Sequence, residues 1–401
     1  MKRQYITSER AHFMCPDMHF GMLMEVEKAY EPEAVKATLE RMALAHPFLK
    51  SLIAYEEESS RLYYRMTENS QIDLYIREDS ASLWTDYQAI GEQDWNVFEN
   101  GMLKVYVYPQ AQGMKLLFVA HHLLTDGRGL LSLAQEFAHD YVKGIVPDYA
   151  EEVLIESIHD LPEKSALSGI SKWLVQSANK QWKKENHAVD YAQYRRFVKT
   201  YSQSRSIKYD TYEVSGDAYA QMTALCKENG FSMNDLLMAQ MYLKTGAEKI
   251  IIAADIRKTL PRYVEGSMGN YSTAMGIHFK AKDKDVVKTA KAVRAKVQKS
   301  LKNNRTLMLV LACYFDMVPE LLDAAAITAL GGFESKAALF VGDRMFGFKQ
   351  PKSYSITNLG KVEDPSIKSL MFIPPASPAS ILCLGVVTLN GVMRGCSSKR
   401  V

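Results

Sequence analysis

The chain has 401 residues, enough for roughly two to three domains of ordinary size. Apolar residues make up 47% of it and charged residues 24%, which is typical of a globular protein. Its formal net charge of +3 is too small to indicate a nucleic-acid partner. The longest apolar runs, 307–315 and 381–389, are far shorter than the ~18 residues that a membrane helix needs. We therefore expect neither a nucleic-acid-binding protein nor a membrane span.

The N-terminus and the cysteines suggest a reducing compartment. Met1 is followed within a few residues by Ser8-Glu9-Arg10 and not by an apolar core, so we expect no signal peptide and a cytoplasmic location. The five cysteines form no Cys-x2-Cys pair and have no regular spacing. Free cysteines tend to lie reduced in apolar surroundings, so the sequence predicts neither a zinc site nor a disulfide framework.

The first 150 residues read as a mixed sheet with helices, an α/β or α+β arrangement. Pro32 begins a predicted helix that runs to about His46 and ends at Pro47. The polar segment 56–60 separates two runs that predict a hairpin. The predicted strands of this half are 18–26, 48–55, 61–66, 103–108 and 114–120.

Residues 151–205 show a weak pattern and read as a partly helical crossover, followed by a second unit of residues 206–401. In that unit Ser215 and Ser232 are predicted N-caps of two helices, and a third helix is predicted over 283–303. The basic face of the third helix is either solvated or in contact with an anionic ligand. The predicted strands are 207–214, 249–254, 271–279, 354–357, 370–373, 381–389 and 392–396.

The segment that stands out chemically follows the predicted buried strand 115–120. It reads His121-His122-Leu123-Leu124-Thr125-Asp126-Gly127, and helical spacing resumes at Gly129. A histidine at a strand end can serve as a general base, because its ordinary pKa of about 6.5 leaves it mostly neutral at pH 7. The residues alone leave a catalytic base and a structural pair equally open.

Two other interpretations of this segment are weaker. His121, His122 and Asp126 could bind a metal, but adjacent residues at a strand end point to opposite faces, and no further ligand completes a zinc set. Asp126-Gly127-Arg128-Gly129 follows a strand and opens a helix, as in dinucleotide binding, yet Ser132 stands where the third glycine is needed.

The segment resembles the His-His-x3-Asp-Gly signature of the CoA-dependent acyltransferase superfamily, which includes chloramphenicol acetyltransferase, alcohol acetyltransferases and condensation domains. Three further segments are similar to blocks of that family in the same order. They are Ala45-His46-Pro47-Phe48-Leu49, Asp255-Ile256-Arg257 with Gly269-Asn270-Tyr271, and Ser355-Ile356-Thr357-Asn358-Leu359-Gly360. The resemblance extends over nearly the full chain.

The resemblance implies a fold and roles for single residues. The fold would be two chloramphenicol-acetyltransferase-like α/β domains, residues 1–150 and 206–401, which form a pseudo-dimer with an active-site tunnel between them. His122 would be the general base. His121 and Gly127 would shape its turn, and an ion pair between Asp126 and Arg257 would hold the loop. Oxyanion or substrate contacts would come from Ser355, Thr357, Asn358 and Asn270.

The implied function is transfer of an acyl group from an acyl-CoA, or from an acyl-carrier-protein thioester, to a small-molecule alcohol or amine. Transfer would be direct, without a metal, an acyl-enzyme or a permanently bound cofactor. One alternative is a condensation-type enzyme that uses carrier-bound acyl groups, and another is a catalytically silent binding member. The sequence lacks the Asp-Phe-Gly-Trp-Gly motif of the BAHD subgroup, so we do not expect a member of that subgroup. No segment resembles a carrier domain, which disfavours a multidomain peptide synthetase and leaves a carrier protein as a separate partner open. In two blocks the sequence departs from the commoner residue of the resembled family: Tyr271 stands in place of Phe after Gly-Asn, and Thr357 in place of Ser before Asn358.

Overall fold

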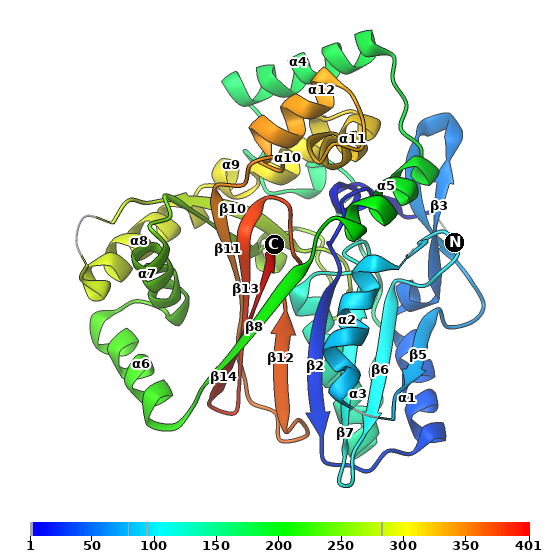
Figure 1. Cartoon of the computed structure of the whole chain (residues 1–401), viewed down its shortest axis with the longest axis vertical. Coiled ribbons are helices and arrows are strands. Elements are labelled where there is room, and N and C mark those ends of the chain that lie inside the picture. Colours follow the sequence, from blue (N-terminus) through cyan, green and yellow to red (C-terminus); the bar gives the residue numbers. More distant parts are fainter. Residues whose placement is uncertain (1–2, 79, 94, 282–283) are drawn as a thin grey trace.

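The computed structural model describes residues 3–78, 80–93, 95–281 and 284–401. Two large β-sheets stand side by side, each with helices on its outer side, and a group of helices lies across one end of both (Figure 1). The sheets have the strand orders β12-β2-β7-β6-β5 and β10-β9-β11-β13-β14-β8, and a small third sheet has the order β1-β4-β3. This is the α/β class of mixed sheets that the sequence predicts.

The five-stranded sheet is buried on both faces, which explains the continuous apolar run before His121. On β7, Leu116 and Phe118 pack with helices α1 and α3, whereas Leu117 and Val119 pack with helix α2 on the opposite face. Successive side chains of a strand point to opposite faces, so a strand covered on both sides must be apolar throughout. The strands of this sheet are β2 (Phe20–Val26), β5 (Ile72–Ile76), β6 (Leu103–Pro109), β7 (Met114–Ala120) and β12 (Ser369–Ile373).

The six-stranded sheet has one buried face and one partly open face. Ile250 and Ile252 of β9 lie in the core beneath helices α7 and α8, while Ile251 and Ala253 face the other way and stay accessible. The strands are β8 (Ile207–Val214), β9 (Lys249–Asp255), β10 (Ser272–His278), β11 (Ser353–Val362), β13 (Ser380–Leu389) and β14 (Val392–Arg400). The small sheet consists of β1 (Tyr5–Ile6), β3 (Ser51–Glu56) and β4 (Arg61–Met66).

The helices are described by the part of the chain to which they belong. Those of the first part are α1 (Pro32–Ala45), α2 (Leu83–Glu92) and α3 (Gly127–Lys143), and the crossover contributes α4 (Gly169–Glu185) and α5 (Tyr191–Gln203). The second part has α6 (Gly216–Asn229), α7 (Met233–Thr245), α8 (Val286–Leu301), α9 (Asn304–Leu307), α10 (Leu309–Asp316), α11 (Pro319–Ala329) and α12 (Lys336–Leu339). Helix α12 continues into a wider helical turn, Phe340–Met345.

Helices α4, α10, α11 and α12 form a helical cap with its own apolar core at one end of the molecule (Figure 1). Leu321, Ala325 and Val341 are buried there against Val175 and Trp182 of α4. The sequence prediction did not include helices 309–345, because their alanines and leucines show no clear amphipathic period. The cap is therefore the main element that sequence patterns missed.

One strand of the C-terminal part completes the N-terminal sheet. Strand β12 pairs antiparallel with β2, with Phe372 opposite Met22, and Figure 1 shows it between β2 and β14. The C-terminal part of the chain therefore contributes one strand to the N-terminal sheet, and this strand ties the two parts of the molecule together. The predicted boundaries at residues 150 and 205 stay a prediction.

Most predicted elements are confirmed within a few residues. The strand predicted over 48–55 begins only at Ser51, because Pro47 opens a single helical turn, Pro47–Lys50. Ser232 caps α7 through its side chain as predicted, whereas Ser215 occupies the N-cap of α6 without a side-chain bond. The predicted start of helix α8 at Asp283 lies outside the described residues. No helix in the described part of the chain is long and apolar enough to cross a membrane.

We predict that a buried ion pair anchors the N-terminal segment to the helical cap. The Arg10 guanidinium donates to both carboxylate oxygens of Asp323, at 2.9 and 2.6 Å, and both side chains are 4% exposed. Arg10→Ala should lower the free energy of unfolding by about 3–5 kcal/mol, because it leaves a buried carboxylate without its partner. Urea denaturation measures the change.

The control for Arg10→Ala is Lys36→Ala, which breaks the exposed pair of Lys36 with Glu33. That change should cost about 0–1 kcal/mol. Equal effects of the two substitutions would show that the buried pair does not anchor the cap.

Candidate active site

Strand β7 delivers the His-His segment to a tight turn. The backbone N–H of His121 donates to the carbonyl of Met102 at 2.9 Å, and the N–H of Leu124 then donates back to the His121 carbonyl at 2.9 Å. The hydroxyl of Tyr64 donates to the carbonyl of Leu123. These bonds fix the turn before helix α3 begins at Gly127. These bonds fix the backbone from which both imidazoles project.

His122 lies in the wall of a cavity of about 280 Å³. Its imidazole stacks on the ring of His12 at a centroid distance of 4.2 Å, and Phe20 packs against it at 4.8 Å. Burial lowers the pKa of His122 below its ordinary value of 6.5, although the Asp126 charge and an Asn270 contact act in the opposite direction. A neutral imidazole at pH 7 is the result, which is the form a general base needs.

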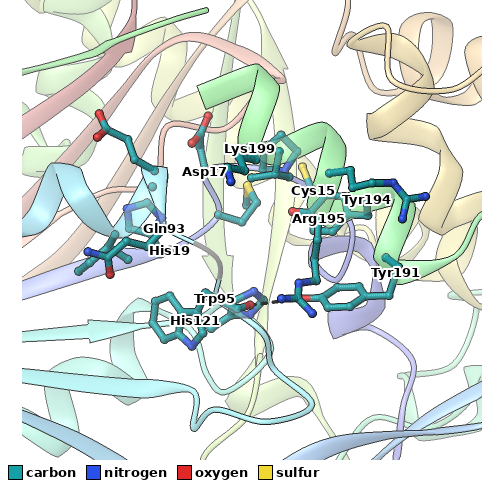
Figure 2. Close-up of a pocket in the computed structure, with 18 residues that line it drawn as sticks. Cys15, Asp17, His19, Gln93, Trp95, His121, Tyr191, Tyr194, Arg195 and Lys199 are labelled. Carbon is teal, nitrogen blue, oxygen red and sulfur yellow. Dashed lines mark hydrogen bonds between the residues drawn. The ribbon is translucent and has the colours of Figure 1, made fainter. Parts of the chain in front are cut away.

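His121 points to the other side of the turn. It lines a second cavity, of about 500 Å³, together with His19, Trp95 and Tyr191 (Figure 2). Burial, with a smaller contribution from His122, lowers the pKa of His121 to about 3. The two histidines therefore face different cavities, as alternation at a strand end predicts. In the described part of the chain, no group of three His, Cys, Asp or Glu side chains could hold a metal ion.

Asp126 joins the turn to the second half of the molecule. Its carboxylate caps helix α3 by accepting from the N–H groups of Arg128 and Gly129, each at 3.0 Å. It also accepts from both Arg257 Nη atoms, at 3.0 and 2.9 Å, and from the Tyr271 N–H at 2.9 Å. The predicted ion pair is confirmed, and the Asp126 side chain is only 3% exposed.

Asn270 makes a second link between the halves. Its Nδ2 donates to the carbonyl oxygen of His122 at 2.8 Å, so it holds the backbone of the proposed base. The Oδ1 of Asn270 is buried and has no hydrogen-bond partner among the described residues. A buried acceptor without a partner is costly, and such atoms call for a functional or structural reason.

Gly127 lies where the start of α3 approaches the C-terminal part of the chain closely. A Cβ at this position would lie 3.1 Å from Leu359 of β11 and 3.2 Å from Phe372 of β12. Both contacts come from the C-terminal part of the chain, so the start of α3 packs directly against it. The predicted role of Gly127 in shaping the turn stays a prediction.

The residues predicted as oxyanion or substrate contacts are divided between two cavities. Ser355 and Thr357 of β11 line the cavity of His122, as does Asn270. Asn358 points elsewhere: it lines a neighbouring cavity with Asp126 and Arg257, and its Oδ1 accepts from the Gly360 N–H at 2.9 Å. Thr357 lines both cavities.

Sequence patterns missed the N-terminal segment as part of the site. Ser8 and His12 line the His122 cavity, and the buried Glu9 carboxylate accepts from the Asn270 N–H at 3.4 Å. Burial raises the pKa of Glu9 to about 7. The one available signal was His12, the first histidine of the chain, which no spacing rule connects to His122.

Comparison with known proteins identifies the family. The model of the family described as Condensation domain matches residues 18–306. Surfactin synthase subunit 1 of Bacillus subtilis is 26% identical over 152 residues. That match covers 36% of this chain and 4% of the much longer relative.

Solved structures share the fold over almost the whole chain. The trichothecene 15-O-acetyltransferase TRI3 of Fusarium sporotrichioides has a TM-score of 0.65 at 11% identity, covering 99% of this chain and 90% of that one. The first condensation domain of the CDA synthetase has a TM-score of 0.64 at 11% identity, with the same coverage. The fold is therefore the two-lobed, chloramphenicol-acetyltransferase-like fold that the sequence resemblance predicts.

We predict that the carboxylate of Asp126 is a main stabilising contact of the site. Asp126→Ala should lower the free energy of unfolding by about 3–5 kcal/mol, because the largely buried Arg257 would keep only its longer contact with Asp255, at 3.3 Å, and three backbone N–H groups would lose their acceptor. The double substitution of Asp126 and Arg257 should cost less than the sum of the single ones. Urea denaturation of the four proteins of this cycle measures the coupling.

The matched control is Asp210→Asn, on a carboxylate that is 61% exposed and pairs with Lys208 at 3.1 Å. It should cost about 0–1 kcal/mol. Additive single effects at Asp126 and Arg257 would contradict the prediction.

Proposed function

The chain belongs to the Condensation domain family, and on that premise we propose that it transfers an acyl group from a thioester to a hydroxyl or amine, with His122 as the general base. The observation that carries the proposal is a buried imidazole with a lowered pKa in the wall of an apolar cavity. A neutral histidine held in one orientation can accept a proton from a bound acceptor.

The proposed reaction has two steps. His122 takes the proton of the acceptor O–H or N–H while the acceptor atom attacks the thioester carbonyl carbon, which gives a tetrahedral oxyanion. The oxyanion then collapses, the C–S bond breaks, and the imidazolium of His122 returns its proton to the departing thiolate. No group of the protein is acylated, and the steps need neither a metal nor a bound cofactor.

Stabilisation of the oxyanion falls to hydroxyl donors in the same cavity. Ser355 and Thr357 lie two residues apart on β11, so both point from one face of the strand into the cavity. One well-placed donor is worth about 3 kcal/mol of activation free energy. Asn270, which holds the carbonyl of His122, and the ion pair of Asp126 with Arg257 act as positioning groups.

The thioester donor is an acyl-CoA or an acyl group on a carrier protein, and the acceptor is a small alcohol or amine. An acetyltransferase and a condensation domain share this fold, so either donor is compatible with it. Family membership favours the condensation-type alternative, which uses acyl groups bound to a carrier protein. In a binding-only member of the family, the cavity would hold a thioester without turnover.

A donor panel tests the proposal. The protein is incubated with acyl-CoAs or with acylated carrier proteins, together with mixed alcohols and amines, and products are identified by mass spectrometry. We expect an ester or amide from one donor class, and His122→Ala should lower its rate by about 10²–10⁴. Product from CoA donors alone identifies an acyl-CoA transferase, and product from carriers alone identifies a condensation enzyme.

The control in the donor panel is His121→Ala, which alters the neighbouring imidazole on the far side of the turn and should have the smaller effect on rate. Full activity of His122→Ala would rule out the base assignment. Binding of a thioester without any product from either donor class would leave only the binding role.

The pH dependence gives a second test of His122. Because the neutral imidazole is the base and burial lowers its pKa, kcat/KM should stay high down to pH 6.5 and fall only at lower pH. The pH profile of kcat/KM for the donor is measured from pH 5 to 8, with the enzyme saturated with acceptor. A midpoint of the acidic limb above 6.5 would contradict a lowered pKa at the base.

A further inference from the structure

The cavity of His122 has a floor made by one face of the six-stranded sheet. On β9 the residues Lys249, Ile251 and Ala253 line it, and on β10 the residues Ser272, Ala274 and Gly276 do so. Each set alternates along its strand, so all six share one face of the sheet. Most of these side chains are small, which leaves room above the sheet for a bound chain.

The roof of the cavity is apolar and comes from the helical cap. Val310, Leu311 and Tyr314 of α10, together with Phe346 and Phe348, cover the floor. A slot with a flat floor and an apolar roof fits an extended hydrocarbon chain. Asn270 and Ser272 mark the end nearest His122, because Asn270 holds the carbonyl of His122.

Lys249 lies at the opposite end of the floor. It is four residues from Ala253 along β9, which is a distance of roughly 13 Å at the usual rise of a strand. The strand register places it opposite His278, at the end of β10, whereas Ser272 at the start of β10 lies opposite Asp255. A ligand that reaches from His122 to Lys249 would therefore run along both strands.

The charge of Lys249 is not compensated by any residue that the structure describes. The side chain is half-buried, and no salt bridge or hydrogen bond joins it to another residue in the described part of the chain. The carboxylate next to it in sequence, Glu248, pairs with Lys280 at 3.3 Å. Burial without a compensating charge lowers the pKa of Lys249. A cation in such surroundings gains most from an anion that enters the cavity.

Gly276 keeps Lys249 in place over the floor. A Cβ at position 276 would lie 2.7 Å from Cε of Lys249, so the lysine stem runs across the glycine. The residue opposite Gly276 on β9 is Ile251, which lines the cavity as well. The lysine is therefore directed along the floor of the slot.

We propose that the cavity selects a substrate with an extended apolar body and a carboxylate or phosphate at its remote end, and that Lys249 binds this anion. This proposal names a substrate class for the proposed acyl transfer. It rests on the proposed function in one respect, namely that the end of the substrate beside His122 is the one that reacts. The anion would lie at one end of the slot and the reacting group beside His122 at the other. An apolar molecule without the anion would leave the lysine uncompensated.

Calorimetry with single-chain amphiphiles tests the proposal without any need for turnover. The probes are octanoate, decanoate and dodecanoate, the alcohols of the same lengths, and decyl phosphate, all at pH 7. The protein should bind the best carboxylate or phosphate about tenfold more tightly than the matching alcohol, the factor of one charge-assisted hydrogen bond. Comparison of decanoate with decyl phosphate shows which anion the protein binds more tightly.

Substitutions assign the preference to Lys249. Lys249→Met should bind the alcohol as the parent does and lose the preference for the anion, whereas Lys249→Arg should keep it. The control Lys280→Met removes an ammonium that is 84% exposed and should change nothing. Gly276→Ala, which displaces the lysine stem, should weaken the preference even if Lys249→Met does not fold.

Equal affinity of the parent protein for anion and alcohol would overturn the proposal, and so would a preference that survives in Lys249→Met. His122→Ala separates this inference from the proposed function, because it should lower the rate of turnover by about 10²–10⁴ and leave the anion preference intact. An anion preference without any turnover in the parent protein would refute the acyl transfer alone. Turnover without the preference would refute the role of Lys249 alone.

Discussion

The carboxylate of Asp126 is the contact on which the arrangement of the site depends. A buried carboxylate must be compensated, and this one is compensated from both halves of the molecule: by two N–H groups at the start of α3 and by Arg257 and the Tyr271 backbone across the interface. The turn that carries His122 is therefore fixed to the second half as firmly as to its own strand. Asn270 adds a bond to the carbonyl of His122 from the same segment as Tyr271.

The fold alone does not choose the reaction, because similar structures include an acetyltransferase and a condensation domain. The wall of the cavity beside His122 has two parts. The sheet face above β9 and β10 carries small side chains where a closed core would need large ones, and the helical cap closes the space from above. In our proposals the acyl-transfer chemistry and the selection of a substrate therefore come from different elements, the first from the turn after β7 and the second from the cap and the open sheet face.

Much of the fold was predictable because its elements have strong local patterns. The apolar run of β7, the proline at the start of α1 and the serine cap of α7 are each decided by neighbouring residues in the sequence. His122, Asp126 and Arg257 were found through the order of motifs, and the geometry of Asp126 and Arg257 agrees. His12 and Lys249 could not be found in this way, because their importance arises only when distant segments meet. The alanine-rich helices of the cap were missed for a similar reason: they are buried on most sides and so lack a polar face.

The crossing of β12 into the first sheet also affects how the chain reaches its native state. Strand β2 is made early in synthesis, yet one of its edges has no partner until residues 369–373 emerge near the end. An open strand edge is a template for pairing with other chains, so the N-terminal half carries an aggregation hazard for most of translation. A chain cut after the crossover would keep that edge exposed permanently. The two halves are therefore similar in architecture but unequal in folding, since the first depends on the last part of the second to close its sheet.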